Sequence, residues 1–298
     1  MLRPVLAVLA LVVLGACTTG SPEPEPTAEP SASVSSPSTT PPASSGRYVA
    51  LGDSYASGPG IPTITPESGF CLRSDHAYPA LLAERIGASD FVDVSCAGAG
   101  TQSVTTGVNG GIAGSATPPQ LDAVTPDTEL VTITIGGNDG ILEGLLTACV
   151  RGGDAACSSY ADGTATDVLR STGAAVADVL RQVASRAPEA QVVLVGYLGL
   201  TPESGTCETL GLSAGSAAAA HRIEDELDTT LASSARTADV DYVSMRAASA
   251  GHDVCADEPW VNGINGLDQT DGIALHPKRV GMEAVAEQVA RRLTARRR

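Results

Sequence analysis

A serine and a histidine give this chain the chemistry of a nucleophile and a base. Ser54 lies in VALGDSYASG, where an apolar run ends on Gly-Asp-Ser, and His276 lies in GIALHPKRVG, a loop-like stretch before the last helical pattern. A serine attacks an acyl carbon when a base takes its proton, and histidine is the commonest such base. The pair predicts acyl-transfer chemistry. The alternative is that Ser54 only caps a helix, with Asp53 in the preceding turn.

Two glycine-containing turns offer donors for the negative charge that such an attack creates. Asn138 follows two glycines in ITIGGND, and its side-chain amide can donate to an oxyanion. Gly98, in SCAGAG, presents a backbone N–H with no side chain in the way. The alternative for both is a purely structural turn, which for Gly98 would be a tight turn beside Cys96.

The elements that must position these side chains alternate along the chain. Apolar, β-branched runs predict strands, and spaced apolar residues predict helices between them. Strands that are apolar throughout and separated by helices indicate a parallel sheet covered on both faces. Functional groups in such sheets gather at the carboxyl ends of the strands, where Ser54, Gly98 and Asn138 lie. The expected strands are 47–53, 91–97, 129–137, 190–197 and 240–245, and the expected helices are 78–87, 167–186, 213–236 and 279–293.

The chain carries a strong excess of acidic residues. Its formal net charge is −16, with only 18 Lys and Arg. A protein that binds nucleic acid needs a basic face to displace counterions, so we expect no nucleic-acid partner. The acidic surface favours solubility but does not indicate the fold.

The first 46 residues are predicted to form an export signal followed by a tether. Residues 1–16 have an early Arg3 and an apolar run too short to span a bilayer, which is typical of a signal peptide. The ending LGAC resembles a bacterial lipobox with lipid attached to Cys17, which would anchor the chain to the outer face of a membrane. The alternative is an ordinary signal peptide and a secreted chain. Residues 17–46 are rich in Pro, Ser and Thr and predict a spacer, which leaves one domain over 47–298.

The remaining cysteines predict disulfides, because an even number in an exported chain favours pairing over thiol chemistry. We expect the sequential pairs, of which the middle one closes CVRGGDAAC around turn-forming glycines. A zinc site is the alternative, but no C-x-x-C spacing is present. The six residues are Cys71, Cys96, Cys149, Cys157, Cys207 and Cys255.

The chain resembles the GDSL-type, or SGNH, serine hydrolases in four motifs taken in order. These are GDS at 52–54, the glycine Gly98, GGND at 136–139 and HP at 276–277. The cysteine layout is similar to that of the secreted actinobacterial esterases and lipases, which carry three sequential disulfides. The resemblance implies an α/β fold, a three-layer α/β/α sandwich with a mostly parallel, flavodoxin-like sheet. It also implies that Ser54 is the nucleophile and His276 the base, and that the N–H of Ser54, the N–H of Gly98 and the amide of Asn138 form the oxyanion hole.

One position departs from the family pattern. The family usually has an aspartate three residues before the histidine, where this chain has Ile273. Either a main-chain carbonyl near Ile273 supports His276, giving a Ser–His dyad, or Asp271 reaches in from an altered loop. The carbonyl is the preferred interpretation.

These features predict an exported carboxylester hydrolase that acts on a small-molecule or lipid ester. We expect a monomer that needs no cofactor and no metal. We also expect it to be attached to a membrane only through its lipid anchor. Two alternatives remain: an acyltransferase with the same Ser–His machinery, and a non-catalytic surface binding protein, since fold does not fix function.

Overall fold

The computed structural model describes residues 46–108, 116–266 and 270–296. All of these belong to one compact unit, Pro41–Arg298. The expected signal peptide 1–16, Cys17 and all but the last residue of the expected tether 17–46 lie outside the described residues.

A five-stranded parallel sheet forms the centre of the domain, with the strand order β2-β1-β3-β4-β5. This is the flavodoxin-like order that was predicted. β1 and β3 lie in the middle of the sheet, so their carboxyl ends are adjacent. The strands are β1 Arg47–Gly52, β2 Asp90–Asp93, β3 Thr128–Thr134, β4 Gln191–Val195 and β5 Asp241–Val243.

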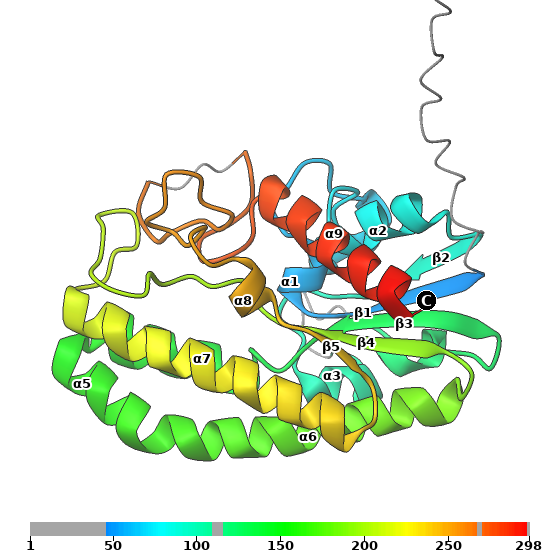
Figure 1. Cartoon of the computed structure of the whole chain (residues 1–298), viewed down its shortest axis with the longest axis horizontal. Coiled ribbons are helices and arrows are strands. Elements are labelled where there is room, and N and C mark those ends of the chain that lie inside the picture. Colours follow the sequence, from blue (N-terminus) through cyan, green and yellow to red (C-terminus); the bar gives the residue numbers. More distant parts are fainter. Residues whose placement is uncertain (1–45, 109–115, 267–269, 297–298) are drawn as a thin grey trace, which may run out of the picture. The chain divides into compact units, whose positions relative to one another are not determined.

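Helices cover both faces of the sheet (Figure 1). The helices α2 (Tyr78–Ile86) and α9 (Arg279–Arg296) pack together on one face. On the other face α6 (Ala165–Arg186) packs against α7 (Ala214–Thr237). The shorter elements are α1 Ser54–Ser57, α3 Thr101–Thr106, α4 Ile141–Leu145, α5 Gly153–Ser159, α8 Met245–Ala248, the 3-10 turns η1 Pro66–Cys71 and η3 Gln120–Ala123, and the π-helical η4 Leu146–Arg151 and η5 Tyr160–Thr164.

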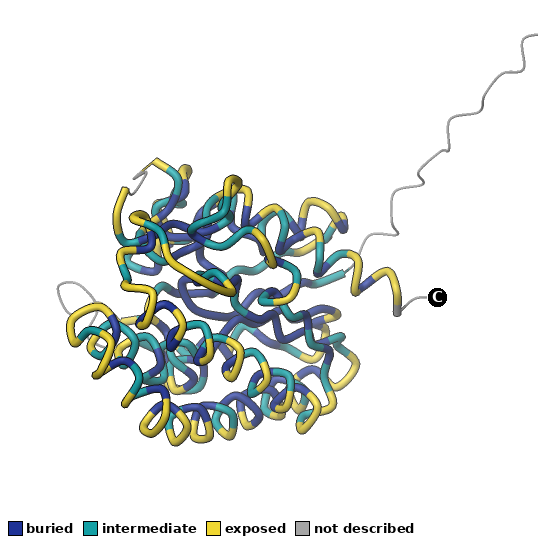
Figure 2. The backbone as a smooth tube through the Cα atoms, turned by 60° about the vertical axis from the view of Figure 1, so that its left-hand side comes forward, coloured by how far each residue is buried: buried dark blue, intermediate teal, exposed yellow. Residues whose placement is uncertain are grey.

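Alternate residues of each strand feed the two cores, as the pleat requires. In β1, Tyr48 and Ala50 face the α2–α9 side, whereas Val49 and Leu51 face the α6–α7 side, and all four are fully buried. Buried residues gather in the interior of the domain and exposed residues on its outer surface (Figure 2). Burial on both faces explains why the strands are apolar without alternation.

All five strands end earlier than the sequence predicted, β2 and β3 by the most. β2 ends at Asp93 because the Asp93 carboxylate accepts hydrogen bonds from the N–H and the hydroxyl of Ser95, which turns the chain out of the sheet. β3 ends at Thr134, just before Gly136 takes up a φ of 116°, which a residue with a side chain rarely adopts. β4 ends at Val195. The polar turns that follow the strands are therefore longer than expected.

The disulfides are Cys71–Cys96, Cys149–Cys157 and Cys207–Cys255, the predicted sequential pairs. CVRGGDAAC, expected to be a short loop with turn-forming glycines, is mostly helical, because η4 and α5 occupy most of it. The change of direction is confined to Gly153, whose φ is 74°. One left-handed glycine between two helical segments is enough to bring the two cysteines together.

Candidate active site

Ser54 is presented by a sharp transition from strand to helix. β1 ends at Gly52, and Asp53 is the N-cap of α1, its Oδ1 accepting from the N–H of Tyr55 at 2.8 Å. Ser54 is therefore the first helical residue and not the N-cap that the alternative interpretation proposed. Its hydroxyl is left for other partners, and the residue is only 6% exposed.

His276 contacts Ser54 directly. Its Nε2 lies 2.7 Å from Oγ of Ser54, and its Nδ1 lies 2.8 Å from the carbonyl oxygen of Ala274. A carbonyl only accepts, so Nδ1 must donate, and a neutral ring then has its lone pair on Nε2. Burial lowers the pKa of His276, and the bond to Ala274 partly opposes this shift. The ring is thus held in the tautomer that accepts the serine proton.

Asp271 occupies a different place. Its Oδ1 accepts from the N–H of Arg279 at the start of α9, at 2.7 Å, and its carbonyl accepts from Nδ2 of Asn262 at 2.8 Å. The group at Nδ1 of His276 is a main-chain carbonyl, one residue beyond Ile273. Leu275, between the carbonyl and the histidine, has a φ of 61°, which is uncommon for a residue with a side chain.

The turns that carry Gly98 and Asn138 are joined to each other. Nδ2 of Asn138 donates to the carbonyl of Ala99 at 3.0 Å, and Oδ1 of Asp139 accepts from the N–H of Thr101 at 2.9 Å. Gly98 is exposed, has a φ of 80°, and has open space where a side chain would be. The glycine is required by its backbone conformation, and its surface is accessible to a ligand.

Three contacts at the site were not anticipated. Tyr55 donates its hydroxyl to the carbonyl of Leu275 at 2.7 Å, next to His276. Tyr197, which follows β4, donates to Oδ2 of Asp53. Gln120 bonds both backbone groups of Gly52, at 2.7 and 2.9 Å. The position of Tyr55 beside Ser54 was a signal that could have been used, whereas nothing in the sequence marks Tyr197 or Gln120.

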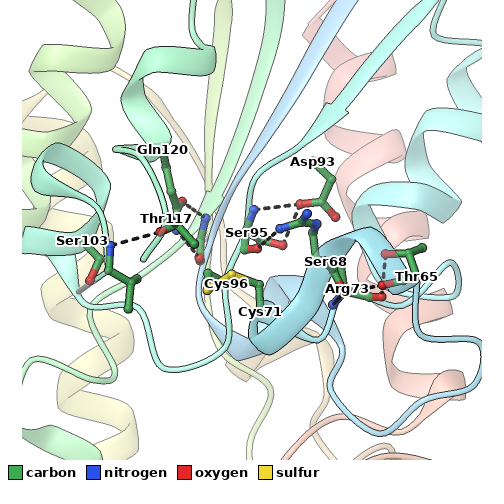
Figure 3. Close-up of a disulfide and its surroundings, with 12 residues drawn as sticks. Thr65, Ser68, Cys71, Arg73, Asp93, Ser95, Cys96, Ser103, Thr117 and Gln120 are labelled. Carbon is green, nitrogen blue, oxygen red and sulfur yellow. Dashed lines mark hydrogen bonds between the residues drawn. A yellow bond between two sulfur atoms is a disulfide. The ribbon is translucent and has the colours of Figure 1, made fainter. Parts of the chain in front are cut away.

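The Cys71–Cys96 disulfide supports the turn that contains Gly98 (Figure 3). The N–H of Ala97 donates to the carbonyl of Cys71 at 3.1 Å, and Nη1 of Arg73 donates to the carbonyl of Ser95 at 3.0 Å. The residues on either side of Cys96 are therefore fixed to η1 and the segment after it.

Among the described residues, no helix is long and apolar enough to cross a membrane. In the same residues no group of three His, Cys, Asp or Glu side chains could hold a metal ion.

Comparison with known proteins places the chain in a family. Residues 50–284 match the model of the GDSL-like lipase/acylhydrolase family. The chain belongs to this family. A lipase of Streptomyces coelicolor, "Lipase 1", is 34% identical over 247 residues, which is 80% of this chain and 84% of the relative.

Two solved structures resemble this GDSL-family hydrolase closely. Phospholipase A1 from Streptomyces albidoflavus is 30% identical, with a TM-score of 0.72, over 83% of this chain and 98% of the other. An extracellular lipase from Streptomyces rimosus is 31% identical, with a TM-score of 0.71, over 83% of this chain and 99% of the lipase. The chain is thus a carboxylic ester hydrolase with the α/β fold of its family, and the extracellular relative indicates export.

Proposed function

We propose that this hydrolase cleaves carboxylic esters through an acyl-enzyme on Ser54, with His276 as the general base. The observation that carries the proposal is the 2.7 Å contact between Nε2 of His276 and Oγ of Ser54. The bond from Nδ1 to Ala274 supports it, because this bond selects the neutral tautomer that a base needs.

The reaction has two halves. As Oγ of Ser54 attacks the ester carbonyl carbon, its proton passes to Nε2 of His276. The tetrahedral intermediate collapses, the C–O bond to the alcohol breaks, and His276 returns the proton to the departing oxygen. Water, deprotonated by His276, then attacks the acyl-enzyme and releases the carboxylic acid and free Ser54.

The oxyanion of each intermediate is held by three donors: the N–H of Ser54, the N–H of Gly98 and Nδ2 of Asn138. The N–H groups at the start of a helix lack intrahelical acceptors, which leaves the Ser54 amide available. The open space at Gly98 and the bonded pair of turns support the other two donors. Ala274 supplies the carbonyl that orients the imidazolium, in place of an aspartate.

The substrate is an ester with an apolar acyl chain. The named relatives are lipases and a phospholipase A1, which supports this class. Ile273 is 39% exposed, and its carbonyl accepts from the N–H of His276 at 3.2 Å, so an apolar side chain is available near the base. An apolar chain gains free energy by covering such a surface.

Hydrolysis of p-nitrophenyl esters from acetyl to palmitoyl, by the full chain and by its Ser54→Ala variant, tests the proposal. Ser57→Ala is the matched control, because Ser57 is a buried serine of the same helix whose hydroxyl has no hydrogen-bond partner among the described residues. We expect Ser54→Ala to lose turnover and fluorophosphonate labelling, and Ser57→Ala to retain both. Labelling that persists in Ser54→Ala contradicts the proposal. Labelling without hydrolysis of any ester favours the acyltransferase alternative.

We further propose that the mature chain is a monomer attached through a lipid on Cys17 to the outer face of the membrane. The lipobox-like LGAC and the Pro/Ser/Thr-rich residues 17–46 support an anchor with a spacer. Cys17→Ser is expected to release active enzyme into the medium. Retention of this variant in the membrane fraction contradicts the anchor, and a dimer mass in light scattering contradicts the monomer.

A further inference from the structure

Tyr197 connects two of the turns that meet at Ser54. Its hydroxyl donates to Oδ2 of Asp53, the residue before Ser54, and accepts from the N–H of Gly137, the residue before Asn138, at 2.8 Å. The first bond spans 144 residues of sequence and the second spans 60. One side-chain atom therefore lies between the backbone of the nucleophile and the backbone of the amide donor.

The direction of each bond is fixed by chemistry. The N–H of Gly137 can only donate, so the phenol oxygen must accept from it, and the single phenol hydrogen is then free for Asp53. The other oxygen of Asp53 accepts from the N–H of Tyr55 at 2.8 Å. The Asp53 carboxylate thus bonds to the residue after Ser54 on one side and to Tyr197 on the other.

The hydrogen bonds that join Tyr197 to Asp53 and Gly137 are shielded from water, which strengthens them. Asp53 is 1% exposed, and the ring of Tyr55 packs edge-on against Tyr197 with centroids 4.9 Å apart. Gly137 lies close to the phenol, because an added Cβ would lie 3.0 Å from the Tyr197 hydroxyl oxygen, which is tighter than an ordinary contact. The turn before Asn138 is packed directly against the phenol.

We propose that Tyr197 is a positioning residue that sets the spacing between Ser54 and Asn138 through its bonds to Asp53 and Gly137. This inference rests on the proposed roles of Ser54 and Asn138. Asn138 is held on its other side by the carbonyl of Ala99, so Tyr197 supplies the second of two constraints. A donor that is displaced from the developing oxyanion lowers the rate of reaction with little effect on substrate binding.

Tyr197→Phe removes the hydroxyl and keeps the ring. We expect kcat to fall by about 10- to 100-fold, because small misplacements of catalytic groups have effects of this size, while KM stays within about twofold. Tyr242→Phe is the matched control. Tyr242 also donates to a carboxylate, Oδ1 of Asp228 at 2.6 Å, and within the described part of the chain its hydroxyl makes no hydrogen bond to the three site turns. Both variants lose a tyrosine–aspartate bond, so only the kcat value separates positioning from general stabilisation.

Asp53→Asn removes the charged acceptor of the Tyr197 hydroxyl, because an amide whose oxygen still accepts from the N–H of Tyr55 turns its NH2 group toward the phenol. If the two residues act through one bond, the double variant has a kcat no lower than that of the worse single variant. A boronic acid, which forms a tetrahedral adduct on the serine, is expected to bind Tyr197→Phe more weakly by a factor similar to the loss in kcat.

A kcat for Tyr197→Phe within twofold of the Tyr242→Phe value overturns the inference, as does additivity of Tyr197→Phe and Asp53→Asn. If Tyr197→Phe does not fold, Asp53→Asn alone, measured against Tyr242→Phe, gives the same comparison. Ser54→Ala keeps the two proposals apart. Full turnover in Ser54→Ala removes the proposed function, whereas an inactive Ser54→Ala with an unaffected Tyr197→Phe removes only the role of Tyr197.

Discussion

Nε2 of His276 lies 2.7 Å from Oγ of Ser54 across 222 residues of sequence. Backbone contacts hold the histidine in place: the N–H of Asn262 donates to the carbonyl of His276, and the N–H of Leu275 donates to the carbonyl of Asn262. Tyr55, beside Ser54, adds the bond to the Leu275 carbonyl. The loop before α9 is thus bonded to the residues around Val261 and to α1, the helix that carries Ser54.

Replacement of Asp271 is expected to leave catalysis intact. Its carboxylate accepts from the first N–H of α9, and the ring of His276 is oriented by Ala274 instead. Asp271→Asn should keep kcat within about twofold of the wild-type value, since asparagine caps helices as well as aspartate does. Asp271→Ala should lose about 1 kcal/mol of unfolding free energy, measured in urea, with kcat again retained. A loss of kcat of several hundredfold in Asp271→Asn would show that this carboxylate takes part in the reaction.

Asn138→Ala is expected to lower kcat by about 10²–10³-fold while KM changes little, because the amide acts on the oxyanion and not on the bound ester. Asn265→Ala is the control, since Asn265 also donates its amide to a main-chain carbonyl, that of Glu208, and is exposed. Steady-state kinetics on one ester are sufficient. Equal kinetics for the two variants would exclude Asn138 from the oxyanion hole.

The pH profile should show a base with a low pKa. Burial lowers the pKa of His276 below its ordinary value of 6.5, and no carboxylate opposes this shift. Because the neutral form accepts the proton, kcat/KM should stay high as the pH falls and drop only below pH 6.5. Assays at neutral pH after acid incubation separate this titration from acid unfolding. Burial raises the pKa of Asp53 to about 7, so an acid limb with its midpoint above 6.5 contradicts the expectation only if it persists in Asp53→Asn.

Removal of the Cys71–Cys96 disulfide is expected to affect both stability and turnover. The pair closes 25 residues, and the N–H of Ala97 is bonded to the carbonyl of Cys71 just before Gly98. Replacing both cysteines by serine should lower the unfolding free energy by about 2–4 kcal/mol and also reduce kcat. The Cys207–Cys255 double variant, which opens 48 residues, should lose a similar free energy with an unchanged kcat. Equal kcat values for the two double variants, well below their melting temperatures, would show that the first disulfide has no influence on the site.

The sequence predicted the parts of this site that depend on residue type. Ser54 and His276 are in contact, as their residue types suggested. Gly98 and Asn138 stay predicted donors, in two turns that the bond from Asn138 to Ala99 joins. The disulfide pairs also followed from the order of the cysteines. Each of these features depends either on a short stretch of sequence or on the order of strands and helices along the chain.

The remaining contacts depend on backbone geometry and long-range packing. The group that orients His276 is the carbonyl of Ala274, which every residue carries, so no letter in the sequence marks it. Its direction depends on the φ of 61° at Leu275, although leucine gives no indication of a left-handed conformation. Tyr197 and Gln120 reach Asp53 and Gly52 only after β4 and η3 have packed beside β1. Such contacts are known only once the fold is formed.

In the proposed catalytic group, the third member is the carbonyl at residue 274, which does not depend on side-chain identity. A carboxylate in that role would be lost with a single change of residue, whereas any residue that keeps the backbone path at 274 still provides the acceptor. Mutational tolerance should therefore be distributed unevenly along this loop, with many side chains accepted at Ala274 and few at Leu275, whose backbone conformation aims the carbonyl. A peptide carbonyl also has no proton to gain in the working range of an esterase, so acid removes the base itself and leaves its support in place.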